Sequence, residues 1–363
     1  MKIKRLGLKN YRNCENTELI FPTKKTLIIG KNAQGKTNIL ESIYFLSDLK
    51  SPRTSTISDL IQFNKPKFEI SAEVNKNDTD IELDYLYTQE KKRELKINKV
   101  KTAPKDFKLV VKTVLFSTKD LLLLRGTPED RRNWLDRAIS QIYPAYDERL
   151  SKYDKIRIQK NNLLKQEVID EALYDIYNEQ LVITGANIIF IRKKFLKEIE
   201  KIASAKHHTI SETEEFSLNY TCPKDEVEEI SEYLNQELIE RRKEEFARRQ
   251  SCVGPHRDDI EFKINGADAT KFASQGQQRT LVLSLKLSEL EIIKEKTGYY
   301  PILLLDDVLA ELDDIRQNYL LKSIDENTQT IITSVDTLLF EQEFLKDVTI
   351  YNIINGTVKE EKI

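Results

Sequence analysis

Alternating apolar and polar residues at the start of the chain predict β-strands. The apolar positions of this segment are Ile3, Leu6, Leu8 and Tyr11, followed by Leu19 and Phe21. A short apolar run at 27–29 comes next, and apolar residues then recur at the three- and four-residue steps of a helix over 39–46. A strand followed directly by a helix predicts the opening of an α/β domain.

Two further alternating segments, 68–74 and 81–87, flank a short polar stretch at 75–80. Their period of two predicts an antiparallel hairpin or meander with one solvated face. Apolar residues over 109–116 then precede Ser117-Thr118-Lys119-Asp120, after which helical spacing begins. We expect a change from strand to helix at that point.

Between about 130 and 250 the chain is highly charged, contains little glycine and has helical spacing. One apolar stripe consists of Leu173, Tyr177, Leu181, Thr184, Ile188, Ile191, Phe195, Ile199 and Ile202. A second helix is predicted over 225–249, and the alternation over 216–220 predicts a short strand within the connecting loop at 204–223. We expect His207 and His208 to face solvent in this loop. Helices of roughly 30 residues span about 45 Å, so the region is a short arm.

After residue 250 the α/β pattern resumes. Alternation over 260–264 leads to the hairpin-turn dipeptide Asn265-Gly266, and a helix is predicted over about 278–296 with Gly298 as its C-cap. The apolar run 301–305 ends in two acids and predicts a central parallel strand. The pattern therefore predicts a split α/β domain over 1–130 and 250–363, with a helical arm inserted at 131–249.

The segment 30–37 reads Gly-Lys-Asn-Ala-Gln-Gly-Lys-Thr and lies between the predicted strand and helix. This pattern is typical of a loop whose backbone N–H groups wrap a polyphosphate at a helix N-terminus. Lys36 would reach the outer phosphates, and the Thr37 hydroxyl would ligate Mg2+. We therefore expect the chain to bind ATP or GTP.

Two more segments complete this hypothesis. Asp306 ends the predicted central strand, where it could bind the magnesium ion through water, and Asp307 could polarise the attacking water. Ser274 and Gly276 immediately precede a predicted helix, a setting in which a hydroxyl, free N–H groups and the helix dipole favour an anion. A plain N-cap is the alternative interpretation of Ser274.

The composition of the chain limits the classes of function that it can have. The 363 residues carry a formal net charge of only -2 although 33% are charged, so a DNA-binding face would have to be local. One candidate is the lysine-rich stretch over 91–112, for which a solvated face is the commoner explanation. A second and weaker candidate is the basic group within 241–249, whose charge is offset by Glu244 and Glu245. The three cysteines are widely spaced and favour reduced thiols over a disulfide framework or a zinc site. No apolar stretch approaches the roughly 20 residues of a membrane span, and the start of the chain does not resemble a signal peptide, so a cytoplasmic protein is expected.

The order of these motifs resembles the head of an ABC-type ATPase, a mixed sheet with flanking helices and an antiparallel β subdomain. In that class the serine loop of one subunit closes on the nucleotide held by another. Three further motifs are similar to those of the RecF family, the bacterial recombination and repair ATPases of the SMC-like class. They are Phe116-Ser117 with Asp120-Leu121, the segment 126–132 followed by Leu135-Asp136, and the segment 254–259. The segment 8–13 is similar to the N-terminal motif of the SMC-like ATPases.

This resemblance covers essentially the whole chain and implies a weak DNA-dependent ATPase that acts as a switch. It implies an ATP-dependent homodimer on gapped or single-stranded DNA, cooperation with RecR and RecO, and roles in recombination, SOS-linked repair and replication restart. The implied catalytic residues are Lys36 and Asp307, and the implied metal ligands are Thr37 and Asp306. The implied nucleotide contacts are Arg12, Asn13, Gly30, Lys31, Asn32, Ala33, Gln34, Gly35, Lys36, Thr37, Asn38, Ser274, Gly276 and Gln277.

Some positions depart from the family pattern. Thr118-Lys119 stands where the family usually has Pro-Glu. This loop contains no obvious glutamine, so we assign no metal-contacting glutamine to it. Segment 333–336 holds no switch histidine, and residue 307 is aspartate rather than glutamate, so slow hydrolysis is expected. His256 is expected to be structural. The alternative functions are a transporter energy subunit, for which no membrane-partner surface is identified, and a P-loop small-molecule kinase, which would leave Ser274 and the arm without a role.

Overall fold

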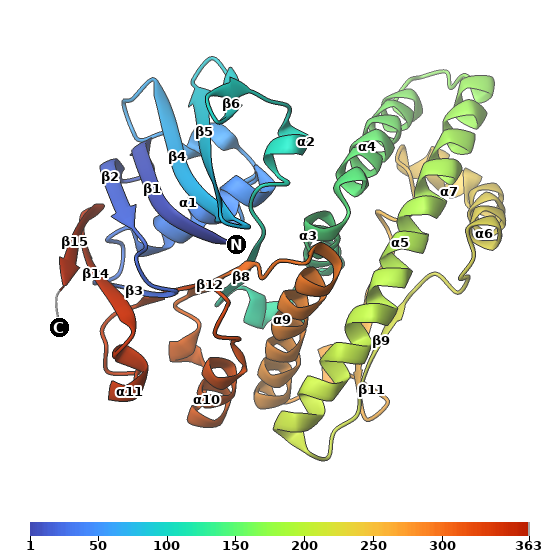
Figure 1. The fold of residues 1–363 in the computed structure, drawn as a ribbon. Helices are drawn as coiled ribbons and strands as arrows, with labels where there is room; N and C mark the ends of the chain where they lie inside the picture. Colours follow the sequence, from blue (N-terminus) through green and yellow to red (C-terminus); the bar gives the residue numbers. More distant parts are fainter. Residues whose placement is uncertain (362–363) are drawn as a thin grey trace. The chain divides into compact units, whose positions relative to one another are not determined.

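The computed structural model describes residues 1–361 and divides into two compact units. The first unit combines Met1–Leu121 with Lys286–Ile363, and the second consists of Leu122–Leu285. In Figure 1 the first unit contains the blue, cyan and red elements, and the second contains the green and yellow ones. The chain therefore leaves the first unit once and returns to it, as an inserted domain requires.

A largely parallel sheet forms one layer of the first unit. Its strands are β3 (Lys25–Ile29), β8 (Thr113–Ser117), β12 (Ile302–Asp306), β13 (Thr330–Ser334), β14 (Val348–Ile354) and β15 (Thr357–Glu361). They lie in the order β15-β14-β3-β13-β12-β8, with the β14–β15 pair antiparallel and the other pairs parallel. The apolar run before Asp306 was predicted to be a central parallel strand; β12 is parallel and paired on both sides, and it lies next to the edge strand β8.

An antiparallel sheet forms another layer of the same unit. Its strands are β1 (Lys2–Tyr11), β2 (Cys14–Ile20), β4 (Lys67–Lys76), β5 (Thr79–Thr88), β6 (Arg93–Ile97) and β7 (Val100–Lys101), in the order β2-β1-β4-β5-β6-β7. Alternate residues of β4 are buried along its length, which is the one-sided burial that its period of two predicts. The antiparallel hairpin predicted from residues 68–87 is thus confirmed.

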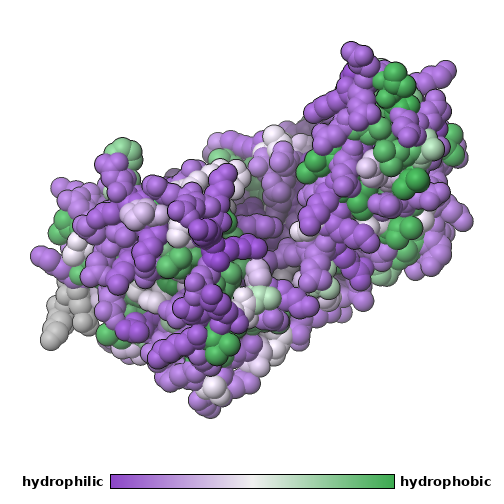
Figure 2. Space-filling model, turned by 90° about the horizontal axis from the view of Figure 1, so that it is seen from above, coloured by the Kyte–Doolittle hydropathy of each residue, from purple (hydrophilic) through white to green (hydrophobic). Residues whose placement is uncertain are grey.

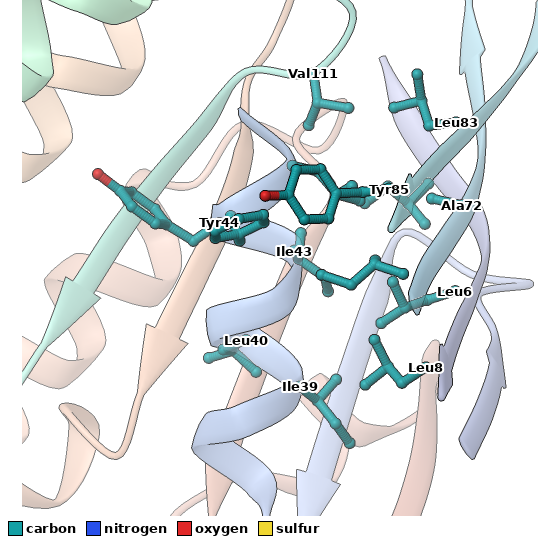
Figure 3. Packing of buried hydrophobic residues seen from close by; sticks show 14 of the residues in the cluster. Leu6, Leu8, Ile39, Leu40, Ile43, Tyr44, Ala72, Leu83, Tyr85 and Val111 are labelled. Atoms are coloured by element: carbon teal, nitrogen blue, oxygen red, sulfur yellow. The ribbon is translucent and has the colours of Figure 1, made fainter. Parts of the chain in front are cut away.

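Helix α1 (Lys36–Asp48) packs between the two sheets. Figure 3 shows Ile39 and Ile43 of this helix on the side of Leu6 and Leu8 of β1, and Leu40 on the other side of the helix, all within one apolar cluster. Aromatic rings extend this core, since Phe45 of α1 meets Tyr85 of β5 edge to face at 4.8 Å between ring centroids. The helix that begins at the phosphate loop is therefore anchored on both sides. The short helices of this unit are α2 (Pro104–Phe107), α10 (Asp314–Ser323) and α11 (Gln342–Leu345).

The second unit is mainly helical. Its longer helices are α3 (Pro128–Ile142), α4 (Pro144–Leu164), α5 (Glu171–Ser211), α6 (Val227–Glu240) and α7 (Arg242–Arg248). A small antiparallel sheet has the order β11-β10-β9 and consists of β9 (Phe216–Tyr220), β10 (Ile260–Ile264) and β11 (Ala267–Asp268). After α8 (Ala269–Phe272), helix α9 (Gln275–Thr297) runs from this unit into the segment that belongs to the first.

The boundaries of the inserted unit differ from the predicted 131–249. The unit continues past residue 249 because β10 pairs with β9 over five residues, from Ile260 with Tyr220 to Ile264 with Phe216, and it ends at Leu285 within α9. The strand pattern after residue 250 was thus correct, but the strands belong to the insertion. Pairing partners are not specified by periodicity, which reports only a local conformation.

Helix α5 covers 41 residues and is longer than predicted. It continues to Ser211 because Ala203 and His207 extend the buried stripe of Ile199 at steps of four. The prediction that His207 faces solvent is therefore wrong, since this side chain is buried in α5, whereas His208 beside it is exposed.

The helix predicted over 225–249 is interrupted at Arg241, which separates α6 from α7. The backbone there has φ of -97° and ψ of 10°, and the guanidinium donates a hydrogen bond to the carbonyl of Cys252. This contact to a residue outside both helices accompanies the break.

Hydrophilic residues predominate on the face drawn in Figure 2, and apolar ones are scattered between them. Exposed apolar side chains on the helices of the second unit include Ile158, Ile176, Ile183 and Ile239. Across residues 1–361, none of the helices combines the length and the apolar character needed to cross a membrane.

Candidate nucleotide-binding site

The loop between β3 and α1 has the backbone conformation that its glycines permit. Gly30 has φ of 153° and Gly35 has φ of 111°. A Cβ atom on Gly30 would lie 2.6 Å from the carbonyl oxygen of Ile353, and one on Gly35 would meet the amide of Asn13. Both positions therefore need glycine for space as well as for dihedral angles. Residues 31–33 of the loop are exposed.

The N-terminus of α1 is suited to an anion. Among residues 1–361, no side chain caps its first turn, so the first N–H groups of the helix are available to a ligand. Lys36 lies at this end with only 4% of its surface exposed, and its Nζ donates a hydrogen bond of 2.7 Å to the carbonyl of Gly30. The ammonium group is thus held against the loop that would wrap the phosphates.

Strand register brings the two predicted acids to this loop. β13 lies between β3 and β12, and its residues Thr333 and Ser334 pair with Asp306 and Ile29 respectively. Because the carboxyl ends of parallel strands meet at one edge of the sheet, the end of β12 faces the loop after β3. Asp307 Oδ2 accordingly lies 4.0 Å from the Nζ of Lys36.

Thr37 and Asp306 meet directly, since the Thr37 hydroxyl donates a hydrogen bond of 2.9 Å to Oδ1 of Asp306. Burial raises the pKa of the Asp306 carboxyl, while hydrogen bonds from Thr37 and Thr333 oppose that shift. A hydroxyl and a carboxylate are the hard oxygen ligands that Mg2+ prefers, and a nearby cation would favour the charged carboxylate. The donor set therefore fits magnesium held partly by phosphate oxygens.

Asp307 has φ of 50°, which is uncommon for a residue other than glycine and turns the chain at the end of β12. Its N–H donates to the hydroxyl of Thr333 at 2.9 Å. Oδ1 of Asp307 is buried and has no hydrogen-bond partner in the described part of the chain. This oxygen can accept a hydrogen bond from a water molecule at the phosphate end of the site.

Arg12 and Asn13 lie beside the same helix. The Arg12 guanidinium donates two hydrogen bonds to the buried carboxylate of Glu41, at 2.8 and 3.0 Å. Asn13 supports the phosphate loop, because its Nδ2 donates to the carbonyl of Gln34 at 3.0 Å and its Oδ1 accepts from the side chain of Asn38 at 2.7 Å. Asn13 thus reaches the start of α1, and Arg12 reaches its second turn.

Sequence reasoning missed two residues of this site. Arg53, on the loop after α1, donates a hydrogen bond of 2.6 Å to Oδ1 of Asn38 and places a positive charge near Asp306. Thr333 contacts both acids at the end of β12, as described above. Arg53 follows the helix without any motif that marks it, and the segment at Thr333 was considered only for its missing histidine.

The predicted serine loop lies in the second unit, where it begins α9. The N–H of Gln277 donates to the Ser274 hydroxyl at 3.2 Å, and the N–H of Ser274 donates to Oε1 of Gln277 at 2.7 Å. This reciprocal arrangement is a capping box, so Ser274 is the N-cap of α9 in this structure, as the alternative interpretation predicted. Ser274 is exposed, and Gly276 in the first turn of the helix is partly exposed. The predicted residues are therefore divided between the units, with Ser274, Gly276 and Gln277 in the second and the others in the first.

The other motifs of the sequence form a buried polar network within the second unit. Arg131 makes two hydrogen bonds to Asp259, at 2.8 and 2.7 Å. Arg192 is buried and binds Asp136 through two hydrogen bonds of 2.9 and 2.8 Å, and it also donates to the carbonyl of Pro255. Segments 126–136 and 254–259 are thus joined by charged groups that would be costly to leave unpaired.

His256 is part of this network, as a structural role predicts. Its Nδ1 accepts from the hydroxyl of Tyr153 at 2.6 Å, and its Nε2 donates to the carbonyl of Ser251 at 3.2 Å. Burial lowers the pKa of His256 to about 3, so the ring is neutral at physiological pH.

The basic stretches are largely paired with acids of their own surface. In the first, Lys92 pairs with Glu90, Lys96 and Lys101 with Glu94, Lys99 with Glu82, and Lys108 with Asp48. In the second, Arg241 and Arg248 pair with Glu244, and Arg242 pairs with Glu171 and Asp175. This pairing fits the interpretation of both stretches as solvated surfaces.

Within residues 1–361, His, Cys, Asp and Glu side chains do not gather in groups of three or more that could hold a metal ion.

Comparison with known proteins agrees with these motifs. The family model described as the RecF/RecN/SMC N-terminal domain matches residues 2–359. The DNA replication and repair protein RecF of Bacillus subtilis (strain 168) is 38% identical over 99% of this chain and 100% of its own length. The protein of the same name from Bacillus cereus (strain G9842) is 39% identical, with 99% and 98% covered.

Solved structures give the same picture. The recombination mediator protein RecF with ATPrS, described as part of the RecFOR pathway, has a TM-score of 0.91 at 34% identity and covers 99% of this chain and 98% of its own. The structure of RecF with ATP has a TM-score of 0.90, also at 34% identity, with 99% and 97% covered. An SMC head bound to the C-terminal winged-helix domain of ScpA is similar in fold, with a TM-score of 0.56 at 16% identity over 100% of this chain and 98% of its own.

Proposed function

Because this chain belongs to the RecF/RecN/SMC N-terminal domain family, we propose that it is a RecF-type, ATP-dependent DNA-binding protein of DNA replication, recombination and repair. The observation that carries this proposal is the hydrogen bond between Thr37 and Asp306. It joins the phosphate loop to the acidic end of β12, where Nζ of Lys36 also lies 4.0 Å from Oδ2 of Asp307. The relatives named for ATP complexes support ATP as the nucleotide.

ATP binds with its phosphates on the loop 30–37 and the first turn of α1. Thr37 and Asp306 would hold Mg2+, which when bound neutralises phosphate charge. Lys36 binds the outer phosphates, and Asp307 accepts a hydrogen bond from the attacking water. Hydrolysis is slow, since segment 333–336 supplies no imidazole and the acid at 307 has a short side chain. Such a weak ATPase acts as a switch.

Two copies of the chain bind two nucleotides between them, with Ser274, Gly276 and Gln277 of each copy facing the phosphates held by the other. The exposure of Ser274 and Gln275 at the start of α9 supports this assignment, because an anion can reach the Ser274 hydroxyl and this helix end. ATP therefore closes a dimer, and hydrolysis reopens it. The dimer acts in the cytoplasm on gapped or single-stranded DNA, and its partners are RecR and RecO, in line with the RecFOR pathway named for the related structures.

Light scattering with and without ATP tests the dimer. The wild-type chain should dimerise with ATP, and Ser274→Arg should stay monomeric while binding ATP with unchanged affinity. Asp314→Arg, at the exposed start of α10, is a control for surface charge and should dimerise normally. Full dimerisation of Ser274→Arg would contradict the two-copy site.

ATP hydrolysis with added DNA tests the partner class. Gapped duplex DNA should stimulate the wild-type rate, and small metabolites or lipid vesicles should not. Stimulation by a metabolite would instead indicate a small-molecule kinase, and stimulation by a membrane partner would indicate a transporter subunit.

A further inference from the structure

We propose that the turn between β14 and β15 is a positioning element for the phosphate loop and sets the affinity for nucleotide. The turn consists of Asn355 and Gly356 and is remote in sequence from the loop that it contacts. Figure 1 shows β14 beside β3 and β15 beside β2, in agreement with their packing. The inference rests on the proposed function, because it concerns the same nucleotide site.

The turn binds Gln34 through two main-chain donors. The N–H of Gly356 donates a hydrogen bond of 2.8 Å to the carbonyl oxygen of Gln34. The N–H of Asn355 donates one of 2.7 Å to Oε1 of the same residue. Gln34 immediately precedes Gly35, from which α1 begins, so the turn holds the main chain and the side chain of the residue that leads into the anion-binding helix end.

The same turn also contacts β2 and the connection that precedes it. The hydroxyl of Thr17 donates to the carbonyl of Gly356 at 2.6 Å. A Cβ atom on Gly356 would collide with the main-chain oxygen of Asn13. Since Asn13 itself donates to the carbonyl of Gln34, the turn, Asn13 and the phosphate loop form one interlocked group.

A cavity lies beside the phosphate loop that the turn supports. This cavity has a volume of about 800 Å³, and its lining includes Gly30, Lys31, Gln34, Asp336 and Ile353. Residues 31–33 are exposed, so this part of the loop receives little packing from its surroundings. The hydrogen bonds to Gln34 therefore hold the loop in place before a polyphosphate binds. Binding then costs less conformational entropy.

The chain contains a matched control for this turn. Asn265-Gly266 connects β10 to β11 with φ of 50° and 76°, and Asn355-Gly356 has φ of 49° and 75°. A Cβ atom on Gly266 would meet nothing within 4 Å. Alanine in place of either glycine therefore costs similar backbone strain, but Gly356→Ala also displaces Asn13 and Gln34.

Calorimetric titration of the full-length chain with a non-hydrolysable ATP analogue tests the proposal. Gly356→Ala should raise the dissociation constant by about tenfold, as the loss of one or two hydrogen bonds implies. Gly266→Ala should leave it within about twofold, although its backbone strain should lower the thermal midpoint, and Gly356→Ala should lower that midpoint further. Wild-type affinity in folded Gly356→Ala, or an equal loss in Gly266→Ala, would overturn the inference.

Two measurements apply if Gly356→Ala does not fold. Thr17→Val removes only the hydroxyl that binds Gly356 and should weaken analogue binding by about threefold. In the wild-type chain, the bound analogue should slow hydrogen exchange at the amides of Asn355 and Gly356, but not at Asn265, whose N–H binds the carbonyl of Glu215. Unchanged exchange at residues 355 and 356 would contradict the proposal.

These outcomes separate the inference from the proposed function. A wild-type chain that does not bind the analogue contradicts the proposed function and the inference together. A wild-type chain that binds it, with Gly356→Ala and Thr17→Val binding equally well, contradicts the inference alone.

Discussion

The hydroxyl of Thr333 donates a hydrogen bond of 3.0 Å to Oδ1 of Asp306. The two residues are register partners across the parallel strands β13 and β12. The same hydroxyl accepts the N–H of Asp307 at 2.9 Å, so one side chain holds both acids at the end of β12. Threonine thus orients the carboxylates from the position next to them in the sheet.

Thr333→Val should reduce the rate of ATP hydrolysis while leaving ATP affinity nearly unchanged. The substitution keeps the shape of the side chain but removes a hydrogen bond to a carboxylate, and a loss of roughly tenfold in kcat is expected. Steady-state kinetics measures kcat and KM separately. Thr330→Val, on the same strand with its hydroxyl bound to the carbonyl of Thr328, should retain the wild-type rate. A wild-type kcat in Thr333→Val would show that the hydroxyl does not orient the acids.

Asp307→Asn should bind ATP and persist as a dimer without turnover. The amide keeps the size of the side chain but removes the charge that polarises water, and a decrease of about a hundredfold or more in kcat is expected. Single-turnover hydrolysis and light scattering measure the two effects. Lys36→Met is the contrasting variant, because it should lose ATP binding itself. If Asp307→Asn hydrolysed ATP at the wild-type rate, this carboxylate would have no catalytic role.

Arg192→Leu should destabilise the second unit by about 3–5 kcal/mol, because it leaves Asp136 partly buried without its partner. Trp134 is the one tryptophan of the sequence and is buried in this unit, so its fluorescence during urea unfolding reports the change. Arg248→Leu, which removes an exposed pair with Glu244, should have a much smaller effect because solvent screens that pair. Equal effects of the two substitutions would contradict a structural role for the buried network.

The contribution of His256 to the stability of the second unit should fall as the pH decreases from about 6.5 towards 3, whereas buried Asp258, whose pKa is raised to about 6, contributes in the opposite direction. The pKa of His256 is lowered in the folded chain, so the unfolded chain takes up a proton that the folded chain excludes. The contribution of His256 is therefore fully present above about pH 6.5 and is lost at about 1.4 kcal/mol per pH unit below it.

Urea unfolding at pH 7 and pH 5, followed by Trp134 fluorescence, measures this contribution. Wild type should lose about 2 kcal/mol more than His256→Gln between these values. A parallel pH dependence in both chains would show that His256 does not exclude the proton.

Much of the local structure follows from the sequence. The period of two specified β4 and β5, and the apolar run before Asp306 specified an inner strand, because both patterns report burial within a few neighbouring residues. The glycines at 30 and 35 likewise determined where a phosphate could be wrapped, since few other residues can adopt their dihedral angles.

Only the tertiary structure decided which distant residues join these elements. Thr333 and Arg53 reach the acids and the start of α1 through strand register and loop path, neither of which leaves a local pattern. The pairing of β10 with β9, which extends the inserted unit to Leu285, was undetermined for the same reason. Periodicity specifies the conformation and the buried side of a segment, but its partner is chosen by packing between residues far apart in the chain.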